Sequence, residues 1–298
     1  MITLQEIERK LEELPLLPDV VVRLLQLKPE DESFFDKVLV LSQEDPTFAL
    51  QVIRLGNSAS SAPVSQIKSL QEAVARVGAD AIAGLITSMA VLRVFVPVHP
   101  GEKELWVHSF QVAVIAKKLA SVLTGLKIDP NQAYLCGLLH DIGRFVMFDK
   151  AALELHKVDE QNWTTPEELI AAELNICGFD HSQLGGKVCS KWGLPDIVRR
   201  VVSYHHMYSD KKQKAIAAHD VHLSDLLKIA QLSDRLSVLL INEPEILSWP
   251  DKALLPALEE CNHPCLASLD ISSERLKTVA EFGVEETARM VKSLGILQ

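Results

Sequence analysis

The stretch "YLCGLLHDIGRFVMF", residues 134–148, decides how this sequence is interpreted. It places His140 directly before Asp141 within a largely apolar run. An ionised carboxylate among leucine and isoleucine side chains is costly to bury unless a cation or a hydrogen-bond network compensates it. The pair therefore favours a present or former metal site over an ordinary helical core.

Helical signals extend from this stretch in both directions along the chain. Residues 129–148 begin with Asp129 and Pro130, an N-cap residue followed by a first-turn proline. The segment "SLQEAVARVG", residues 69–78, has a serine cap with a glutamate three residues later, and it ends at a glycine. An Asp-Pro start at Asp45 predicts a further helix. Since no segment alternates with the period of a strand, we predict an all-α fold.

Helix-breaking residues mark one candidate junction between domains. The segment "PVHPGEKE", residues 97–104, has two prolines and a glycine between helical stretches. We therefore predict an N-terminal helical bundle over residues 1–98. It is expected to pack on a second helical domain, which has additional C-terminal helices, over residues 99–298.

The composition limits the classes of partner. The chain has 298 residues, is 48% hydrophobic, and carries a formal net charge of -10. This acidic balance predicts no general nucleic-acid binding, because phosphate backbones require clustered lysine and arginine. No charge-free apolar run reaches the length of a membrane span, and Met1 precedes a glutamate-rich amphipathic stretch rather than a signal peptide. We expect a cytoplasmic protein that does not enter membranes.

The five cysteines form no recognisable framework. The segment "CNHPC", residues 261–265, lacks the second ligand pair that a structural zinc site needs. Reduced thiols are therefore the favoured interpretation, in keeping with a reducing compartment.

Histidines and aspartates gather after the predicted junction. Imidazole and carboxylate ligands together suit divalent iron, manganese or zinc. Asp180 is expected to cap the helix that starts at His181, and a lone helical histidine such as His222 is expected to be structural. On predicted helices or at their ends lie His108, His140, His181, His205 and His206, and in or near the same helices lie Asp141, Asp180, Asp220, Asp225 and Asp234.

Several segments together resemble an HDOD domain over nearly the full chain. The N-terminal half carries "LPLLPDVVVRLLQL", "SQEDPTFALQVIRLGNSAS" and "IKSLQEAVARVGADAI". The C-terminal half carries "LWVHSF", "LLHDIGR", "FDHSQLGGKVCSKWGLP", "YHH" and "VHLSDLL". HDOD domains are similar to the HD superfamily of metal-dependent phosphohydrolases, and they commonly act in signalling or regulation. The resemblance implies an HD-like domain after residue 98.

The resemblance also implies an arrangement of ligands. The first histidine of the HD pattern is His108, the pair is His140 and Asp141, and the distal aspartate is Asp225, with Asp234 as its rival. The related HD-GYP phosphodiesterases add histidines for a second metal, and these resemble His181, His205 and His206. Glu104 is a candidate extra ligand, and a solvated glutamate is the alternative. The implied cofactor is one or two divalent ions, with iron favoured over manganese or zinc.

The segment after His206 departs from the HD-GYP pattern. It reads "MYSDKKQKAI" and lacks the Gly-Tyr-Pro sequence associated with cyclic dinucleotide recognition. Arg144 and Lys187 are candidate phosphate contacts, and pairing with a carboxylate at a helix end is the equal alternative for Arg144. We therefore expect a signalling or regulatory protein with a retained metal site, little or no hydrolase activity, and a signalling protein or nucleotide as partner. The alternative is a metal-dependent phosphohydrolase or phosphodiesterase acting on a nucleotide or other phosphoester.

Overall fold

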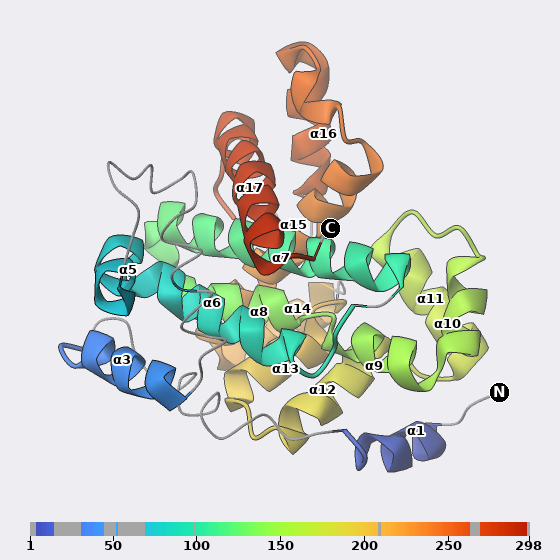
Figure 1. Cartoon of the computed structure of the whole chain (residues 1–298). Coiled ribbons are helices and arrows are strands. Elements are labelled where there is room, and N and C mark those ends of the chain that lie inside the picture. Colours follow the sequence, from blue (N-terminus) through green and yellow to red (C-terminus); the bar gives the residue numbers. More distant parts are fainter. Residues whose placement is uncertain are drawn as a thin grey trace. The chain divides into compact units, whose positions relative to one another are not determined.

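Helices make up the regular structure of this chain (Figure 1). The computed structural model describes residues 4–14, 31–44, 52, 69–97, 99–207, 210–262 and 269–296. No strand occurs in these ranges, which confirms the all-α prediction. The helix predicted from Asp45 and most of the 261–265 cysteine segment lie outside the described residues. No helix in the described ranges has the length and apolar character needed to cross a membrane.

The chain divides into two compact units, which differ in detail from the predicted domains. One unit comprises residues 1–14 and 100–287, and the other comprises residues 15–99 and 288–298. The sequence placed the first 14 residues with the N-terminal bundle, whereas they cluster with the later unit. Helix α1 (Leu4–Leu11) belongs there because the Lys10 ammonium donates to the Lys150 carbonyl at 2.8 Å, and Lys191 donates to the Leu11 carbonyl at 2.6 Å.

The larger unit holds most of the helices. They are α7 (Pro100–Val122), α8 (Pro130–Leu139), α9 (Ile142–Lys150), α10 (Ala152–Asp159), α11 (Pro166–Cys177), α12 (His181–Lys191), α13 (Asp196–Tyr204), α14 (Asp210–His219), α15 (Val221–Asn242) and α16 (Asp251–Cys261), with short 3₁₀ helices η2 (Thr124–Leu126) and η3 (Ile246–Ser248). Helix α17 (Ser273–Leu294) begins in this unit and ends in the other.

The smaller unit contains α3 (Phe34–Glu44), α5 (Leu70–Val77) and α6 (Ala79–Leu92). The Ser69 hydroxyl accepts from the Glu72 amide at 3.1 Å, so the predicted cap of α5 is confirmed. Helix α5 ends at Gly78, whose φ of 83° lies where a side chain would be strained. Local capping therefore fixes both ends of this helix.

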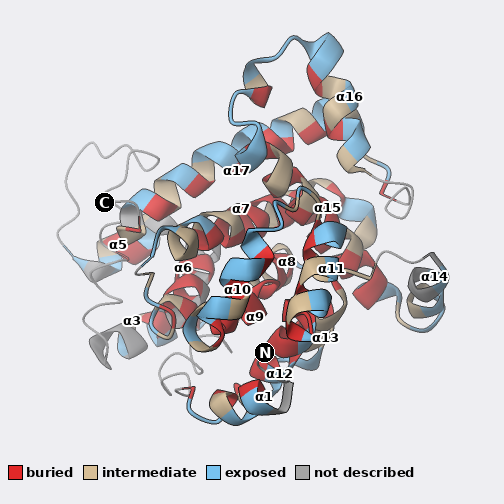
Figure 2. Cartoon of the chain, turned by 90° about the vertical axis from the view of Figure 1, so that its right-hand side faces the viewer, coloured by how far each residue is buried: buried red, intermediate tan, exposed pale blue. Residues whose placement is uncertain are grey.

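Two packed groups of helices form the core of the larger unit. Helix α7 packs on α8 and α15, while α12 packs on α9 and α13. Figure 2 shows buried residues concentrated along α8, α9 and α12. A Cβ atom at Gly143 would lie 1.9 Å from the His181 carbonyl oxygen, so only glycine allows α9 and α12 to approach this closely.

A break in the helix separates α8 from α9 at His140 and Asp141. Helical periodicity alone did not predict this break within residues 129–148. The Asp129 carboxylate caps α8 through the Asn131 amide at 2.9 Å, as the Asp-Pro start indicated. The Arg144 amide donates to the Asp141 carbonyl at 2.8 Å across the turn. The paired residues thus lie on a buried turn between two helices.

Candidate metal centre

Seven side chains from five parts of the larger unit converge in two groups of candidate ligands. One group is Asp141, His181, His205 and His206, and the other is His108, His140 and Asp234. Within each group the potential ligand atoms all lie within 4.8 Å of one another. They come from α7, the α8–α9 turn, the start of α12, the end of α13, and α15. Helices distant in sequence therefore build one continuous cluster.

Asp141 joins the two groups. Its Oδ1 atom lies 2.9 Å from His181 Nε2 and 3.5 Å from His140 Nε2. Its Oδ2 atom lies 3.7 Å from His108 Nε2. One carboxylate thus faces both groups, which is the arrangement needed for a ligand shared by two cations.

Asp234 occupies the position that the sequence assigned to Asp225. Asp234 Oδ1 lies 3.3 Å from His108 Nε2, whereas Asp225 Oδ1 accepts from the Lys228 ammonium at 3.0 Å. The two aspartates are nine residues apart on α15, which puts them about 180° apart around the helix axis and about 13 Å apart along it. Only one can reach His108, so the prediction of Asp225 as a ligand is corrected to Asp234, its rival in the sequence.

The orientation of two imidazoles is fixed by hydrogen bonds from Nδ1 to backbone carbonyls. His140 Nδ1 lies 2.7 Å from the Gly137 carbonyl, and His205 Nδ1 lies 2.7 Å from the Val202 carbonyl. Because a carbonyl only accepts, each Nδ1 carries the proton and each Nε2 presents a lone pair. Outer hydrogen bonds of this kind accompany histidines that bind metals.

His108 is held in the same tautomer by a short relay. The Ser237 hydroxyl donates to the Gln111 side-chain oxygen at 2.8 Å. It therefore accepts from His108 Nδ1, which lies 2.9 Å away. The Nε2 atom of His108 is left facing the cluster.

The spacing of the Nε2 atoms fits a cation between them. His108 and His140 bring Nε2 atoms to 3.2 Å, and His181 Nε2 lies 2.9 Å from His206 Nε2. Two ligands bound about 2.1 Å from one ion at angles of 90–110° are about 3.0–3.4 Å apart. Two unprotonated nitrogens at the spacing of His108 and His140 repel each other unless a cation lies between them. Asp234 Oδ2 is also buried without a hydrogen-bond partner. The residues present therefore fit a divalent metal.

Burial and charge set the protonation of the cluster. Burial lowers the pKa of His140 to about 4, so this imidazole is neutral at pH 7. Burial raises the pKa of Asp141, but the adjacent His140 and His181 outweigh it and hold the pKa well below its usual range. Burial also lowers the pKa of His181, but Glu173 and Asp141 outweigh it and raise the pKa to about 10. A bound cation would take the place of the second proton on His181.

Glu173 on α11 supports His181, and sequence reasoning missed it. Its fully buried carboxylate accepts from His181 Nδ1 at 2.7 Å and from the His181 amide at 2.8 Å. The sequence carried a usable signal, because Leu169, Glu173 and Cys177 recur every four residues on one face of a predicted helix. The structure shows that all three are buried. An acidic residue on an apolar face requires a partner.

Arg144 was predicted to contact phosphate, but two carboxylates surround its guanidinium. It donates to Asp159 at 2.8 Å and to Glu173 at 3.4 Å, and it lies over the Trp163 ring with its carbon 5.3 Å from the ring centroid. Its charge is thus matched inside the protein. The other candidate phosphate contact, Lys187, is exposed on α12 and does not line the pocket beside the cluster.

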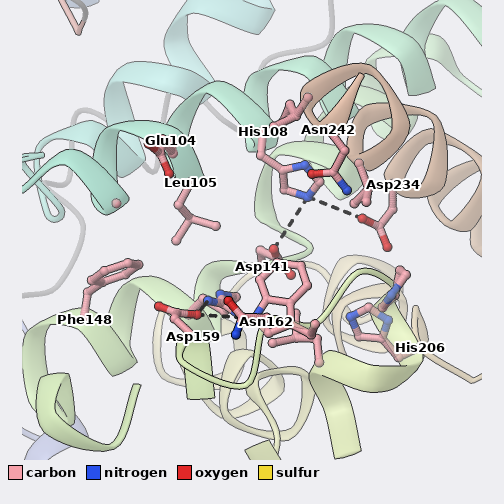
Figure 3. A pocket seen from close by; sticks show the side chains of 17 residues that line it. Glu104, Leu105, His108, Asp141, Phe148, Asp159, Asn162, His206, Asp234 and Asn242 are labelled. Atoms are coloured by element: carbon pink, nitrogen blue, oxygen red, sulfur yellow. Dashed lines mark hydrogen bonds and ion pairs between the residues drawn. The ribbon is translucent and has the colours of Figure 1, made fainter. Parts of the chain in front are cut away.

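A pocket of 440 Å³ opens onto the ligand cluster (Figure 3). Its wall includes His108, Asp141, His206 and Asp234, while the other three cluster histidines do not line it. Glu104 also lines this pocket but belongs to neither ligand group, so the structure does not place it as the extra ligand. The remaining wall is largely apolar: Leu105, Phe148, Trp163, Pro166, Leu169, Val238 and Ile241.

Comparisons with known proteins agree with this architecture. The family model for the HDOD domain matches residues 14–208. An uncharacterized protein of Treponema pallidum (strain Nichols) is 23% identical over 200 residues, which cover 66% of this chain. The match spans only 38% of the length of that relative.

Two solved structures resemble the fold. A Shewanella amazonensis SB2B protein, provisionally assigned as a phosphohydrolase, matches with a TM-score of 0.68 at 21% identity, and the match covers 95% of this chain and 97% of that one. A Marinobacter aquaeolei VT8 protein, provisionally assigned to signal transduction, matches with a TM-score of 0.67 at 21% identity. That match covers 98% of this chain and 61% of the other. At these identities the likeness shows the fold alone.

Proposed function

Because this chain belongs to the HDOD family, we propose that it is a signalling or regulatory protein that has kept an HD-type metal site. HDOD resemblance implies a regulatory role, and the Marinobacter aquaeolei protein carries a provisional assignment of the same kind. The proposed partner is a signalling protein or a nucleotide ligand. The proposed location is the cytoplasm.

One observation carries the metal site in this proposal, namely the convergence of seven candidate ligand side chains, with the Nδ1 atoms of His140 and His205 held by backbone carbonyls. His108, His140 and Asp234 would hold one ion, and His181, His205 and His206 would hold another, with Asp141 shared between them. Iron is preferred because of the HD-GYP resemblance, while the same donors also suit manganese and zinc. When bound, such ions polarise phosphate oxygens and lower the pKa of a coordinated water.

The pocket supports binding more than turnover. Among the described residues that line it, Arg144 is the one lysine or arginine, and Asp159 and Glu173 match its charge. The Gly-Tyr-Pro sequence is missing after His206. We therefore propose weak or absent phosphodiesterase activity. The alternative, a phosphohydrolase, is favoured by the opening of the cluster into the pocket and by the provisional assignment of the Shewanella amazonensis protein.

The test combines metal analysis with an activity panel. Purified protein should contain one or two equivalents of divalent metal by elemental analysis, and Asp141→Ala should lose most of it. The metal-loaded protein is then assayed on phosphomonoesters and phosphodiesters. No turnover above the Asp141→Ala control supports a regulatory protein. Robust turnover that the control lacks would make the protein a phosphohydrolase, and absence of metal from the native protein would contradict the site itself.

A further inference from the structure

The pocket beside the ligand cluster has two chemically different ends. We propose that it binds a small phosphate monoester whose organic group is apolar or aromatic, and that it discriminates against a second anionic group on the same ligand. This inference rests on the proposed metal centre, which would hold the phosphate. It adds the chemistry of the organic group and the discrimination against a second anion.

The two ends of the pocket are separated in space. Figure 3 shows His108, Asp141, Asp234 and His206 toward one end of the pocket, with Leu105 and Phe148 at the other. A ligand bound by its phosphate to ions at the first end would therefore extend its organic group toward the second. At 440 Å³ the pocket lies within the range typical of small-molecule sites, which is about 300–1,000 Å³.

The apolar end is built by two helices that fix the position of an aromatic ring. Phe148 lies on α9, four residues beyond Arg144, and its ring faces Gly101 on α7. A Cβ atom added at Gly101 would lie 3.2 Å from Phe148 Cζ, so a side chain at position 101 would crowd the ring. Leu105, one turn further along α7, lines the same end. An apolar or aromatic group placed there would exchange water for contact with Phe148 and Leu105.

The charges at this end select against a second anion. Glu104 is exposed and lies beside Leu105 in Figure 3. Arg144, whose charge is already matched by two carboxylates, offers little to another phosphate or carboxylate. A second anionic group reaching this end would face the Glu104 carboxylate, and the repulsion between the like charges would lower its affinity. Polyphosphates and carboxylated esters should therefore bind less well than a neutral aryl or alkyl monophosphate.

The proposal is tested by calorimetric binding to the full chain loaded with metal. The ligands are inorganic phosphate, phenyl phosphate and 4-carboxyphenyl phosphate, and a non-hydrolysed phosphonate analogue replaces any ester that is turned over. Phenyl phosphate should bind about tenfold more tightly than inorganic phosphate, which corresponds to burial of much of one ring. The carboxylated ester should lose most of that advantage.

Three variants assign the effect to named side chains. Phe148→Ala should abolish the advantage of phenyl phosphate while leaving inorganic phosphate binding unchanged, and Phe148→Gln should do the same if the alanine variant folds poorly. Glu104→Gln should restore tight binding of 4-carboxyphenyl phosphate. Phe282→Ala, which changes a phenylalanine of α17 that does not line the pocket, should alter none of these affinities.

The outcomes distinguish failure of the ligand inference from failure of the proposed metal centre. Metal uptake and phosphate binding without a preference for phenyl phosphate would overturn the inference and leave the metal centre standing. The same holds if the preference survives in both Phe148 variants, or if the carboxylated ester binds as well as phenyl phosphate. Failure of the native protein to take up metal would defeat the proposed function, and the inference would fall with it.

Discussion

The environment of Glu173 predicts an effect on metal affinity from a residue that is not itself a candidate ligand. Its carboxylate accepts both the amide and the Nδ1 proton of His181, and it also receives a hydrogen bond from Arg144. We expect Glu173→Gln to lower metal affinity by about 10- to 100-fold, because the amide keeps the shape but loses the charge that raises the basicity of His181. Chelator competition on the purified variant measures this change.

A matched control separates this effect from a general change of charge. Glu104→Gln removes one negative charge from the pocket without touching the hydrogen bonds of the cluster, so its metal affinity should equal that of the native protein. Circular dichroism establishes that both variants fold. If Glu104→Gln loses metal to the same extent as Glu173→Gln, Glu104 is a ligand after all and the assignment made here is wrong.

The two aspartates of α15 provide a second test at single residues. Asp234→Asn should sharply reduce metal content, since the amide replaces a carboxylate whose Oδ1 lies 3.3 Å from His108 Nε2. Asp225→Asn should retain metal, because Asp225 pairs with Lys228 rather than with the cluster. Elemental analysis of the two variants side by side gives the answer. The opposite pattern would restore the ligand set first predicted from the sequence.

Contacts between helices bring the candidate ligands together, including those on the turns after α8 and α13. His181 begins α12, and α12 lies against α9 because Gly143 and Gly185 lack side chains. Gly143→Ala would place a Cβ atom against the His181 carbonyl, and a backbone group cannot rotate away as a side chain can. We expect a loss of roughly 1–3 kcal/mol of unfolding free energy, in line with overpacked interiors, together with reduced metal content.

Thermal or urea unfolding measures the first effect, and elemental analysis measures the second. Gly125→Ala is the matched control, since an added Cβ there meets no atom within 4 Å and the residue lies in η2, away from the cluster. The control should change the unfolding free energy little. Equal stability of Gly143→Ala and the native protein would show that α9 and α12 adjust freely, and that the close approach does not fix His181.

Particular residues show which parts of this arrangement the sequence could predict. Helix caps such as Ser69 and Asp129 depend on neighbours within a few residues, so the local sequence pattern was sufficient to predict them. Six of the seven expected ligands converge, because an apolar context and a family pattern both mark His108, His140, Asp141, His181, His205 and His206. The sequence alone does not distinguish Asp225 from Asp234 as a metal ligand. The orientation of α15 relative to α7 decides which of the two side chains faces His108.

Residues whose role depends on a distant partner were harder to predict. Arg144 resembled a phosphate contact, yet its partners are 15 and 29 residues away in the chain. Those partners lie on α10 and α11, whose packing no local pattern specifies. Likewise, no local pattern indicates that residues 1–14 cluster with residues 100–287, or that residues 288–298 cluster with residues 15–99.

At the scale of the whole molecule, the candidate ligands are confined to one of the two units. All seven lie between residues 108 and 234, within the unit of residues 1–14 and 100–287, and α5 and α6 of the other unit supply none. Because they come from helices distant in sequence, ions bound there would link elements that unfolding separates. A ligand that binds only the folded state at 100 times its dissociation constant contributes about 2.7 kcal/mol.

We therefore expect metal removal to act unevenly along the chain. Hydrogen exchange with and without chelator should show faster exchange in α7, α8, α12 and α15 of the metal-free protein, because the ions would no longer link these helices or relieve the repulsion between the facing Nε2 atoms of His108 and His140. Exchange in α5 and α6 should change little. The Asp141→Ala variant should not respond to the chelator at all. Equal acceleration in both units would mean that their stabilities are coupled, and no change in either would contradict a metal centre in the native protein.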